Sequence, residues 1–159
     1  MKKNIVFFIF FMMLSGCASV ESDSVKKDDT INKIISCEKV KSFEAKSADK
    51  KINFIEMIKS STLSLEADDY IKGQKTKQLL LLGADSSKHE SMLSCFTAEK
   101  NNTIKSVSSE FNSIKNNTNN KEERDALIEM FSSWEAYISN MTPDGKFEFN
   151  KALAKYKNI

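Results

Sequence analysis

The side chains able to carry chemistry in this 159-residue chain are few and widely spaced. It has three cysteines, Cys17, Cys37 and Cys95, and a single histidine, His89. A zinc site needs several such ligands at short spacings such as Cys-x-x-Cys, and that spacing is absent. A catalytic nucleophile needs a base within hydrogen-bond reach, which these separations do not indicate. The sequence therefore predicts no metal site, and His89 is expected on the surface of a polar helix start.

Acidic and aromatic residues offer the other candidate sites. Four acids could supply the two carboxylates of a glycosidase-like general acid–base pair: Glu56, Glu66, Asp68 and Asp69. They lie among lysines, which favours a solvated helix face. Trp134 and Tyr137 resemble a binding platform in type, but their helical spacing with Phe131 predicts a place in the core. Because no phosphate-binding loop, nucleophile elbow or His-Glu-x-x-His is present, the sequence predicts no catalytic residue and no enzyme.

A specific motif closes the N-terminal apolar run. Leu14, Ser15, Gly16 and Cys17 follow a stretch of about ten apolar residues, which is too short to span a bilayer. These four residues resemble the lipobox of bacterial lipoproteins. The resemblance covers the first 17 or so residues. It implies that residues 1–16 are a signal peptide, that a peptidase cuts before Cys17, and that Cys17 receives a diacylglycerol thioether.

Lipidation changes what the rest of the chain is expected to do. Acyl chains of the palmitate kind on Cys17 would anchor the protein stably, and no other cofactor is expected. By the same resemblance, Ala18 points to the outer membrane, with the domain facing the periplasm or the cell surface. The alternative is an uncleaved N-terminal helix with a coincidental cysteine. Residues 17–29 then form the lipidated cysteine and a flexible polar tether, and residues 30–159 form the folded domain.

Processing also removes the basic character of the chain. Lys2 and Lys3 are the only charges before Cys17, so the 24 basic residues fall to 22 and equal the 22 acidic ones. A neutral chain whose only arginine is Arg124 lacks the charge expected of a nucleic-acid binder.

The two remaining cysteines suggest a covalent link in an oxidising compartment. A disulfide between Cys37 and Cys95 would close a long loop and stabilise the fold by roughly 4 kcal/mol on the chain-entropy model. The alternative is a pair of buried free thiols that act as small apolar side chains.

Periodicity predicts an all-α fold. Four glycines and one proline leave few breaks, and apolar residues recur at three- and four-residue steps. The expected helices span about residues 30–46, 49–71, 86–114, 121–140 and 146–157. The second begins with Asp49 as N-cap, has Ile52, Ile55 and Ile58 at three- and four-residue steps, and is expected to stop at Gly73. Asp85 or Ser86 is expected to cap the third helix and Asn120 the fourth, and Thr142 to Gly145 predict a turn. The last helix is expected to offer Phe149, Leu153 and Tyr156 to the core. A further segment from Gln74 carries the run Leu79 to Leu82, which is expected in the core, and a break at Gly83 is left open. The sum is a single antiparallel bundle of five or six helices, with one disulfide.

Three functions fit this outline. The first is a non-catalytic interaction or assembly module for another envelope protein, as in the secretin pilotins, which this chain resembles in outline only. The second is an envelope enzyme or enzyme inhibitor that acts on peptidoglycan or glycans. The third is ligand binding between helices near Leu79 to Leu82 and Phe96.

Overall fold

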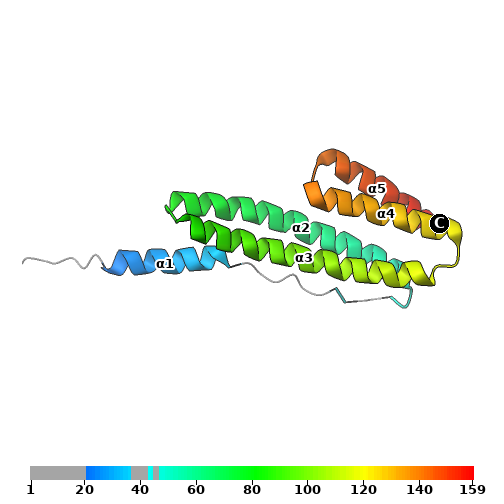
Figure 1. The fold of residues 1–159 in the computed structure, drawn as a ribbon, viewed down its shortest axis with the longest axis horizontal. Coiled ribbons are helices and arrows are strands. Elements are labelled where there is room, and N and C mark those ends of the chain that lie inside the picture. The colour runs from blue at the N-terminus through cyan, green and yellow to red at the C-terminus, as the bar shows by residue number, and fades with distance from the viewer. Residues whose placement is uncertain (1–20, 37–42, 45–46) are drawn as a thin grey trace, which may run out of the picture.

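Every regular element of the described chain is a helix. The computed structural model describes residues 21–36, 43–44 and 47–159, which contain five helices and no strand. The helices are α1 (Glu21–Ile35), α2 (Lys50–Leu81), α3 (Ser86–Asn117), α4 (Lys121–Asn140) and α5 (Pro143–Asn158) (Figure 1). The prediction of an all-α bundle is confirmed.

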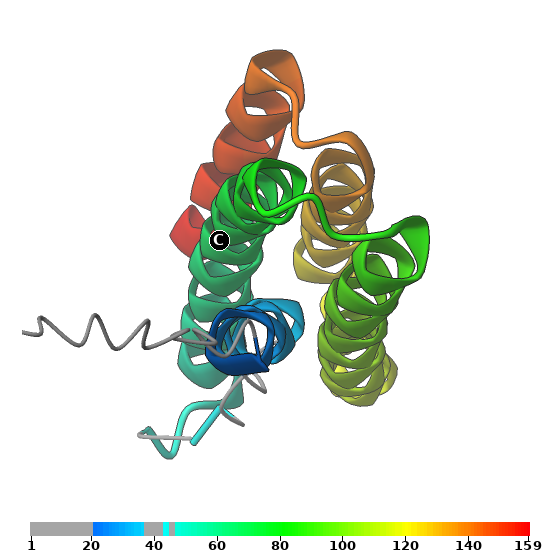
Figure 2. The same cartoon turned by 90° about the vertical axis from the view of Figure 1, so that its left-hand side faces the viewer.

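A long antiparallel hairpin of α2 and α3 is the central element. The shorter α4–α5 hairpin packs on one face of it, over the half that is remote from the α2–α3 turn. Figure 2 shows α4 above α3 and α5 above α2, with α1 on the opposite face. Helix α1 contacts both long helices near their turn. The two halves of the hairpin are therefore covered by different helices, α1 near the turn and α4 with α5 at the remote half.

The larger core lies where α4 and α5 cover the hairpin. Its fully buried residues include Phe54, Ile58, Trp134 and Tyr156. Trp134 is held in place because its indole Nε1 donates a hydrogen bond of 2.9 Å to the buried hydroxyl of Thr62. This arrangement confirms Trp134 as a core residue rather than an exposed platform.

A smaller core attaches α1 to the hairpin. Ile31 of α1 is buried together with Leu79 of α2 and with Met92 and Phe96 of α3. Ile34 and Ile35 pack against this cluster. Three isoleucines at helical spacing thus give α1 an apolar stripe that only the two long helices can cover.

The helix starts are capped as their sequences suggest. Asp49 accepts hydrogen bonds from the backbone N–H groups of Lys51 and Ile52 at the start of α2. Asp85 and Asn120 cap α3 and α4 in the same way. These side chains satisfy N–H groups that have no partner within the helix.

The first helix is not where the sequence analysis placed it. It begins at Glu21 rather than near Thr30, so residues 21–29 of the predicted flexible tether are helical. It also ends at Ile35 rather than near residue 46, and Phe43 is half-buried outside any helix. The three isoleucines that pack on the hairpin lie within both ranges, so this packing fixes where α1 attaches and not where it begins.

The second helix is longer than predicted. It continues through Gly73, which was expected to end it, and absorbs the segment from Gln74. The break comes at Gly83, whose φ of +60° lies in the left-handed region that favours glycine. Of the run Leu79 to Leu82, Leu79 is fully buried and Leu82 is half-buried against the smaller core. The prediction that this run lies in the core is wrong for Leu80 and Leu81, which are exposed.

The predicted turn at residues 142–145 is instead the start of α5. Thr142 is its N-cap and accepts a hydrogen bond from the N–H of Gly145, and Pro143 is the first helical residue. Proline suits that position because its missing N–H would have no helical partner. The predicted core residues Phe149, Leu153 and Tyr156 are buried.

Candidate functional site

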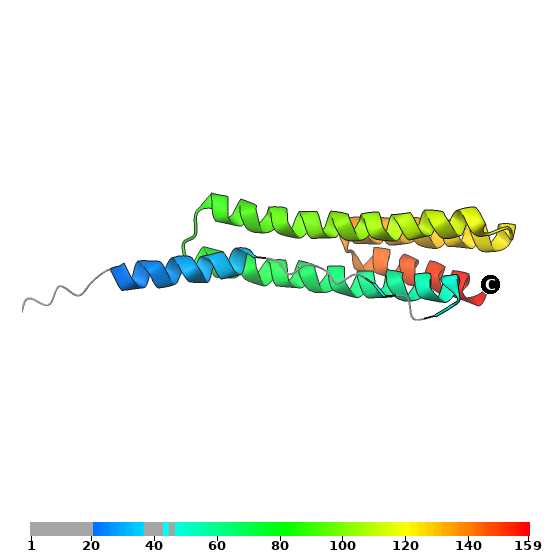
Figure 3. The same cartoon turned by 90° about the horizontal axis from the view of Figure 1, so that it is seen from below.

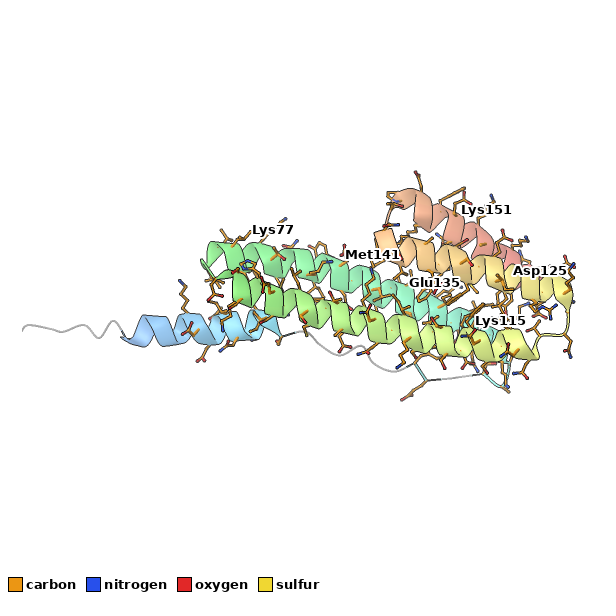
Figure 4. The ribbon with its side chains drawn as sticks, in the orientation of Figure 1. Lys77, Lys115, Asp125, Glu135, Met141 and Lys151 are labelled. Carbon is orange, nitrogen blue, oxygen red and sulfur yellow. The ribbon has the colours of Figure 1, made fainter. Side chains whose placement is uncertain are left out.

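A polar cleft opens where α4 ends above the long hairpin. Met141, which follows α4, forms one wall of it, and Figure 4 shows this residue above the middle of α2 (Figure 4). Beyond this point α2 and α3 continue without α4 and α5 above them. The other lining residues are Leu65, Asp68, Asp69, Lys72, Phe96, Thr97 and Lys100.

Glu66, next in sequence to Leu65 of this cleft, joins α2 to α4 and α5. Its carboxylate accepts hydrogen bonds from the Tyr137 hydroxyl of α4 at 2.5 Å and from Lys146 Nζ of α5 at 3.0 Å. Burial favours the neutral acid, but the bonds from Tyr137 and Lys146 outweigh it and hold the pKa of Glu66 below its usual value. Glu66 is therefore a carboxylate at neutral pH, with two donors fixed on it.

Tyr137 shows the other side of the same contact. Burial, and then the hydrogen bond to the Glu66 carboxylate, raise the pKa of Tyr137 to about 12. A phenol with this pKa holds its proton at neutral pH. It therefore donates a hydrogen bond and does not act as a base.

Asp68 and Lys100 lie further along the cleft. Burial and the nearby charge of Glu99 raise the pKa of Asp68. Lys100 Nζ donates a hydrogen bond of 2.7 Å to the backbone oxygen of Ile138, in the last turn of α4. A lysine at this place neutralises the negative end of the α4 dipole and attaches α4 to α3.

The size of the cleft limits its chemistry. Its volume is about 70 Å³, which is room for a few water molecules and far less than the several hundred Å³ typical of ligand sites. A sugar ring does not fit between these walls. The arrangement of Glu66, Tyr137, Lys146 and Lys100 joins four helices and is not built to hold a substrate.

A larger groove lies between α1 and the end of α2. It has a volume of about 620 Å³, and its lining includes the apolar residues Ile34, Leu81 and Leu82. Lys33 and Lys75 also line it. The Nζ of Lys75 also donates to the backbone oxygen of Ser36, which closes one end of α1 onto α2. This groove is of ligand size, but it is open to solvent along its length.

One edge of α2 carries a row of exposed apolar side chains. Ile52, Leu63 and Tyr70 are 46%, 67% and 69% exposed. Separations of 11 and 18 residues correspond to nearly whole numbers of turns at 100° per residue, so the three side chains share one face of the helix. Ile52 belongs to the three- and four-residue apolar spacing of this helix, but it is exposed, whereas Ile55 and Ile58 are buried. The separations were visible in the sequence, but they match a buried stripe as well as an exposed one.

The structure separates the predicted site residues. Leu14, Ser15, Gly16, Cys17 and Cys37 lie outside the described residues. Cys95 is half-buried on α3. The four candidate acids of α2 are also separated. Asp68 and Asp69 line the cleft, and Glu66 lies beside it and is bonded to Tyr137. Glu56 is exposed nearer the start of α2 and does not line the cleft.

His89 is not the simple surface residue that was expected. It is half-buried in the first turns of α3, and its Nδ1 lies 3.0 Å from the backbone oxygen of Asp85. Its Nε2 is buried and has no hydrogen-bond partner. Among the described residues, no group of three or more histidine, cysteine, aspartate or glutamate side chains is placed to hold a metal ion.

Comparison with known proteins gives no family for this chain. No family model, no curated protein and no solved structure matches it. Within the part of the chain that the structure describes, none of the helices has the length and apolar character needed to cross a membrane.

Proposed function

We propose that this protein is an outer-membrane lipoprotein, anchored through acylated Cys17, whose helical bundle binds another envelope protein as a non-catalytic assembly module. The anchor rests on the lipobox resemblance of Leu14 to Cys17 and on the short apolar run before it. The binding role rests on the bundle. The polar cleft beside Met141 is too small for a substrate, and α2, one of the two longest helices of the bundle, displays a row of apolar side chains.

The exposed edge of α2, made by Ile52, Leu63 and Tyr70, is the observation that carries the binding role. Single exposed apolar residues are common on proteins, but three of them on one edge of a helix offer a partner several apolar contacts along one line. Tyrosine is enriched at such surfaces because it combines a large apolar ring with a polar end. Full burial of one such side chain is worth about 1.5–3 kcal/mol, so three of them could supply a specific contact.

The anchor is tested by changing its acceptor. Cys17→Ser should abolish metabolic labelling with a fatty acid and leave the precursor uncut, since the thiol is the group that takes the lipid. The measurement is the labelling together with the intact mass of the membrane-extracted protein. A Cys17→Ser protein that is still shortened and still bound to membranes would show that the anchor is assigned wrongly.

The binding edge is tested by cross-linking in intact cells and identification of the captured protein. A Leu63→Ser/Tyr70→Ser variant should lose the captured partner, because the apolar contact is removed while the core is untouched. Phe147→Ser is the matched control, since Phe147 is 66% exposed on α5 and is not part of this edge. If both variants retain the same partner as the unchanged protein, the edge is not the binding surface.

We also propose the disulfide between Cys37 and Cys95. Ser36, which precedes Cys37, is attached to α2 through the Lys75 contact, and Ile34 and Ile35 pack on the cluster that contains Met92 and Phe96, on either side of Cys95 in sequence. These contacts support a short path between the two cysteines. The unreduced protein should resist alkylation at both thiols. Alkylation of Cys37 and Cys95 without a reductant would disprove the link.

A further inference from the structure

The turn between α2 and α3 exposes leucines where a polar surface is expected. Leu80 and Leu81, in the last turn of α2, are 65% and 88% exposed, while Leu79 beside them is fully buried. Leu82, the C-cap, is half-buried and lines the groove against α1 together with Leu81. We call Leu80, Leu81 and Leu82 the leucine tip. Two adjacent leucines exposed at a helix end leave apolar area in water that nothing in the fold requires.

The leucine tip lies at the end of the molecule where the chain leads back to Cys17. Figures 1 and 3 both show the start of α1 at the same end as the α2–α3 turn (Figure 3). Cys17 precedes Glu21, the first residue of α1, by only four residues. An extended chain gains at most about 3.6 Å per residue, so four residues allow at most about 14 Å between the Cα atoms of Cys17 and Glu21. An anchor there keeps the leucine tip close to the membrane.

Basic side chains surround the leucine tip. Lys33 and Lys75 line the groove beside Leu81. Lys77 is exposed in the same part of α2, and Figure 4 places it near the turn. Lysines beside apolar residues suit a membrane interface, because the ammonium groups reach anionic phosphates while their carbon stems cover apolar surface.

From these three observations we infer that the leucine tip rests in the lipid surface that carries the Cys17 anchor, as a second membrane contact. This inference rests on the proposed lipoprotein function. Leu80 and Leu81 enter the boundary between headgroups and acyl chains, while Leu82 stays half-buried against the smaller core. The exposed Lys33 and Lys77 face the phosphates, and Lys75 remains bonded to Ser36. Because α1 extends past the turn, both contacts reach one membrane plane only if the long axis of the bundle leans against the membrane. Helices α4 and α5, which cover the face of the hairpin opposite to α1, then face away from it.

The test places a tryptophan at the leucine tip of the full acylated protein. Leu81→Trp and, as the matched control, Leu63→Trp are reconstituted in vesicles of phosphatidylethanolamine and phosphatidylglycerol with or without bromine on the acyl chains. Both positions are exposed leucines of α2, so neither change disturbs the core. Native Trp134 is fully buried and gives a constant background.

Lipid contact predicts a blue shift for Leu81→Trp and a fall of its added emission to roughly half or less with brominated chains, because bromine quenches only at short range. Leu63→Trp should be unaffected. Equal emission of both variants with and without bromine would overturn the inference. So would a blue-shifted Leu81→Trp signal that bromine leaves unquenched, since the tip would then be covered by protein, such as a second copy of the chain.

The intact mass separates this inference from the proposed function. An acylated protein whose Leu81→Trp signal is unquenched disproves the tip contact and leaves the lipoprotein function standing. A protein without acyl chains disproves the lipoprotein function. In that case, quenching of Leu81→Trp by added vesicles still supports the tip contact, and its absence rejects both.

Discussion

Two buried tyrosines differ in what their hydroxyl groups contact. The Tyr137 hydroxyl donates to the ionised Glu66, which Lys146 also contacts. The Tyr156 hydroxyl is buried without a hydrogen-bond partner, although its ring lies under Lys51 Nζ at 4.8 Å. A buried polar group without a partner loses its hydration and gains nothing in return. The tyrosine hydroxyl is therefore expected to stabilise the fold at Tyr137 in α4 and to destabilise it at Tyr156 in α5.

This difference predicts opposite results for one substitution. Tyr137→Phe should lower the free energy of unfolding by about 1.5–3 kcal/mol, because a hydrogen bond to a charged group is lost. Tyr156→Phe should leave it unchanged or raise it slightly. Urea unfolding of the two variants at neutral pH measures both. A Tyr156→Phe variant as unstable as Tyr137→Phe would mean that the Tyr156 hydroxyl makes a stabilising hydrogen bond.

At the scale of elements, two glycines of similar surroundings have opposite roles. Gly73 lies inside α2. Gly83 lies within the α2–α3 turn and has a φ of +60°. A side chain added at either position would meet no atom within 4 Å. Any effect of substitution is therefore a property of the backbone alone. Helix α2 tolerates Gly73 because the packing of Leu79 against Met92 and Phe96 holds the segment that follows.

The glycine pair predicts substitutions of opposite sign. Gly73→Ala should raise the free energy of unfolding by about 0.5–1 kcal/mol, since alanine loses less freedom when it enters a helix. Gly83→Ala should lower it by about 1–2 kcal/mol, because the left-handed conformation strains any side chain. Thermal unfolding of both variants supplies the check. A stabilising Gly83→Ala would contradict the left-handed turn.

For the whole molecule, stability depends on two cores that do not share residues. The larger core contains residues of α2, α3, α4 and α5, and the smaller one attaches α1 near the α2–α3 turn. Tyr137 and Tyr156 both belong to the larger core. Burial raises the pKa of each to about 12, helped by the Glu66 carboxylate at Tyr137 and by Glu123 at Tyr156. Their ionisation therefore affects the fold as a whole.

The two tyrosines predict a loss of stability in alkali. In the unfolded chain they release their protons near pH 10, whereas the folded protein retains them until about pH 12. Their contribution is complete below pH 10 and is lost as the pH rises toward 12, because the unfolded state then binds fewer protons. The urea midpoint should fall over this interval. The fall should be smaller in Tyr156→Phe, and an equal fall in that variant would exclude Tyr156 as a cause.

The sequence by itself determined the helical class and the local signals at helix ends. Asp49, Asp85 and Asn120 were identifiable as caps because capping needs only a short polar side chain and the next few N–H groups. The burial of Trp134 and Phe149 followed from their spacing along single helices. Such features depend on residues within a few positions of one another, so the chain carries them locally.

Only the tertiary structure decided which helix continues and which face is covered. Gly73 did not end α2, because contacts with distant helices outweigh local preferences worth about 1 kcal/mol. Ile52 and Leu81 are exposed although each fits an apolar stripe. The joining of Glu66 to Tyr137 and Lys146 spans more than 70 residues of chain. Periodicity defines the faces of a helix, but the neighbour that covers a face is chosen by packing.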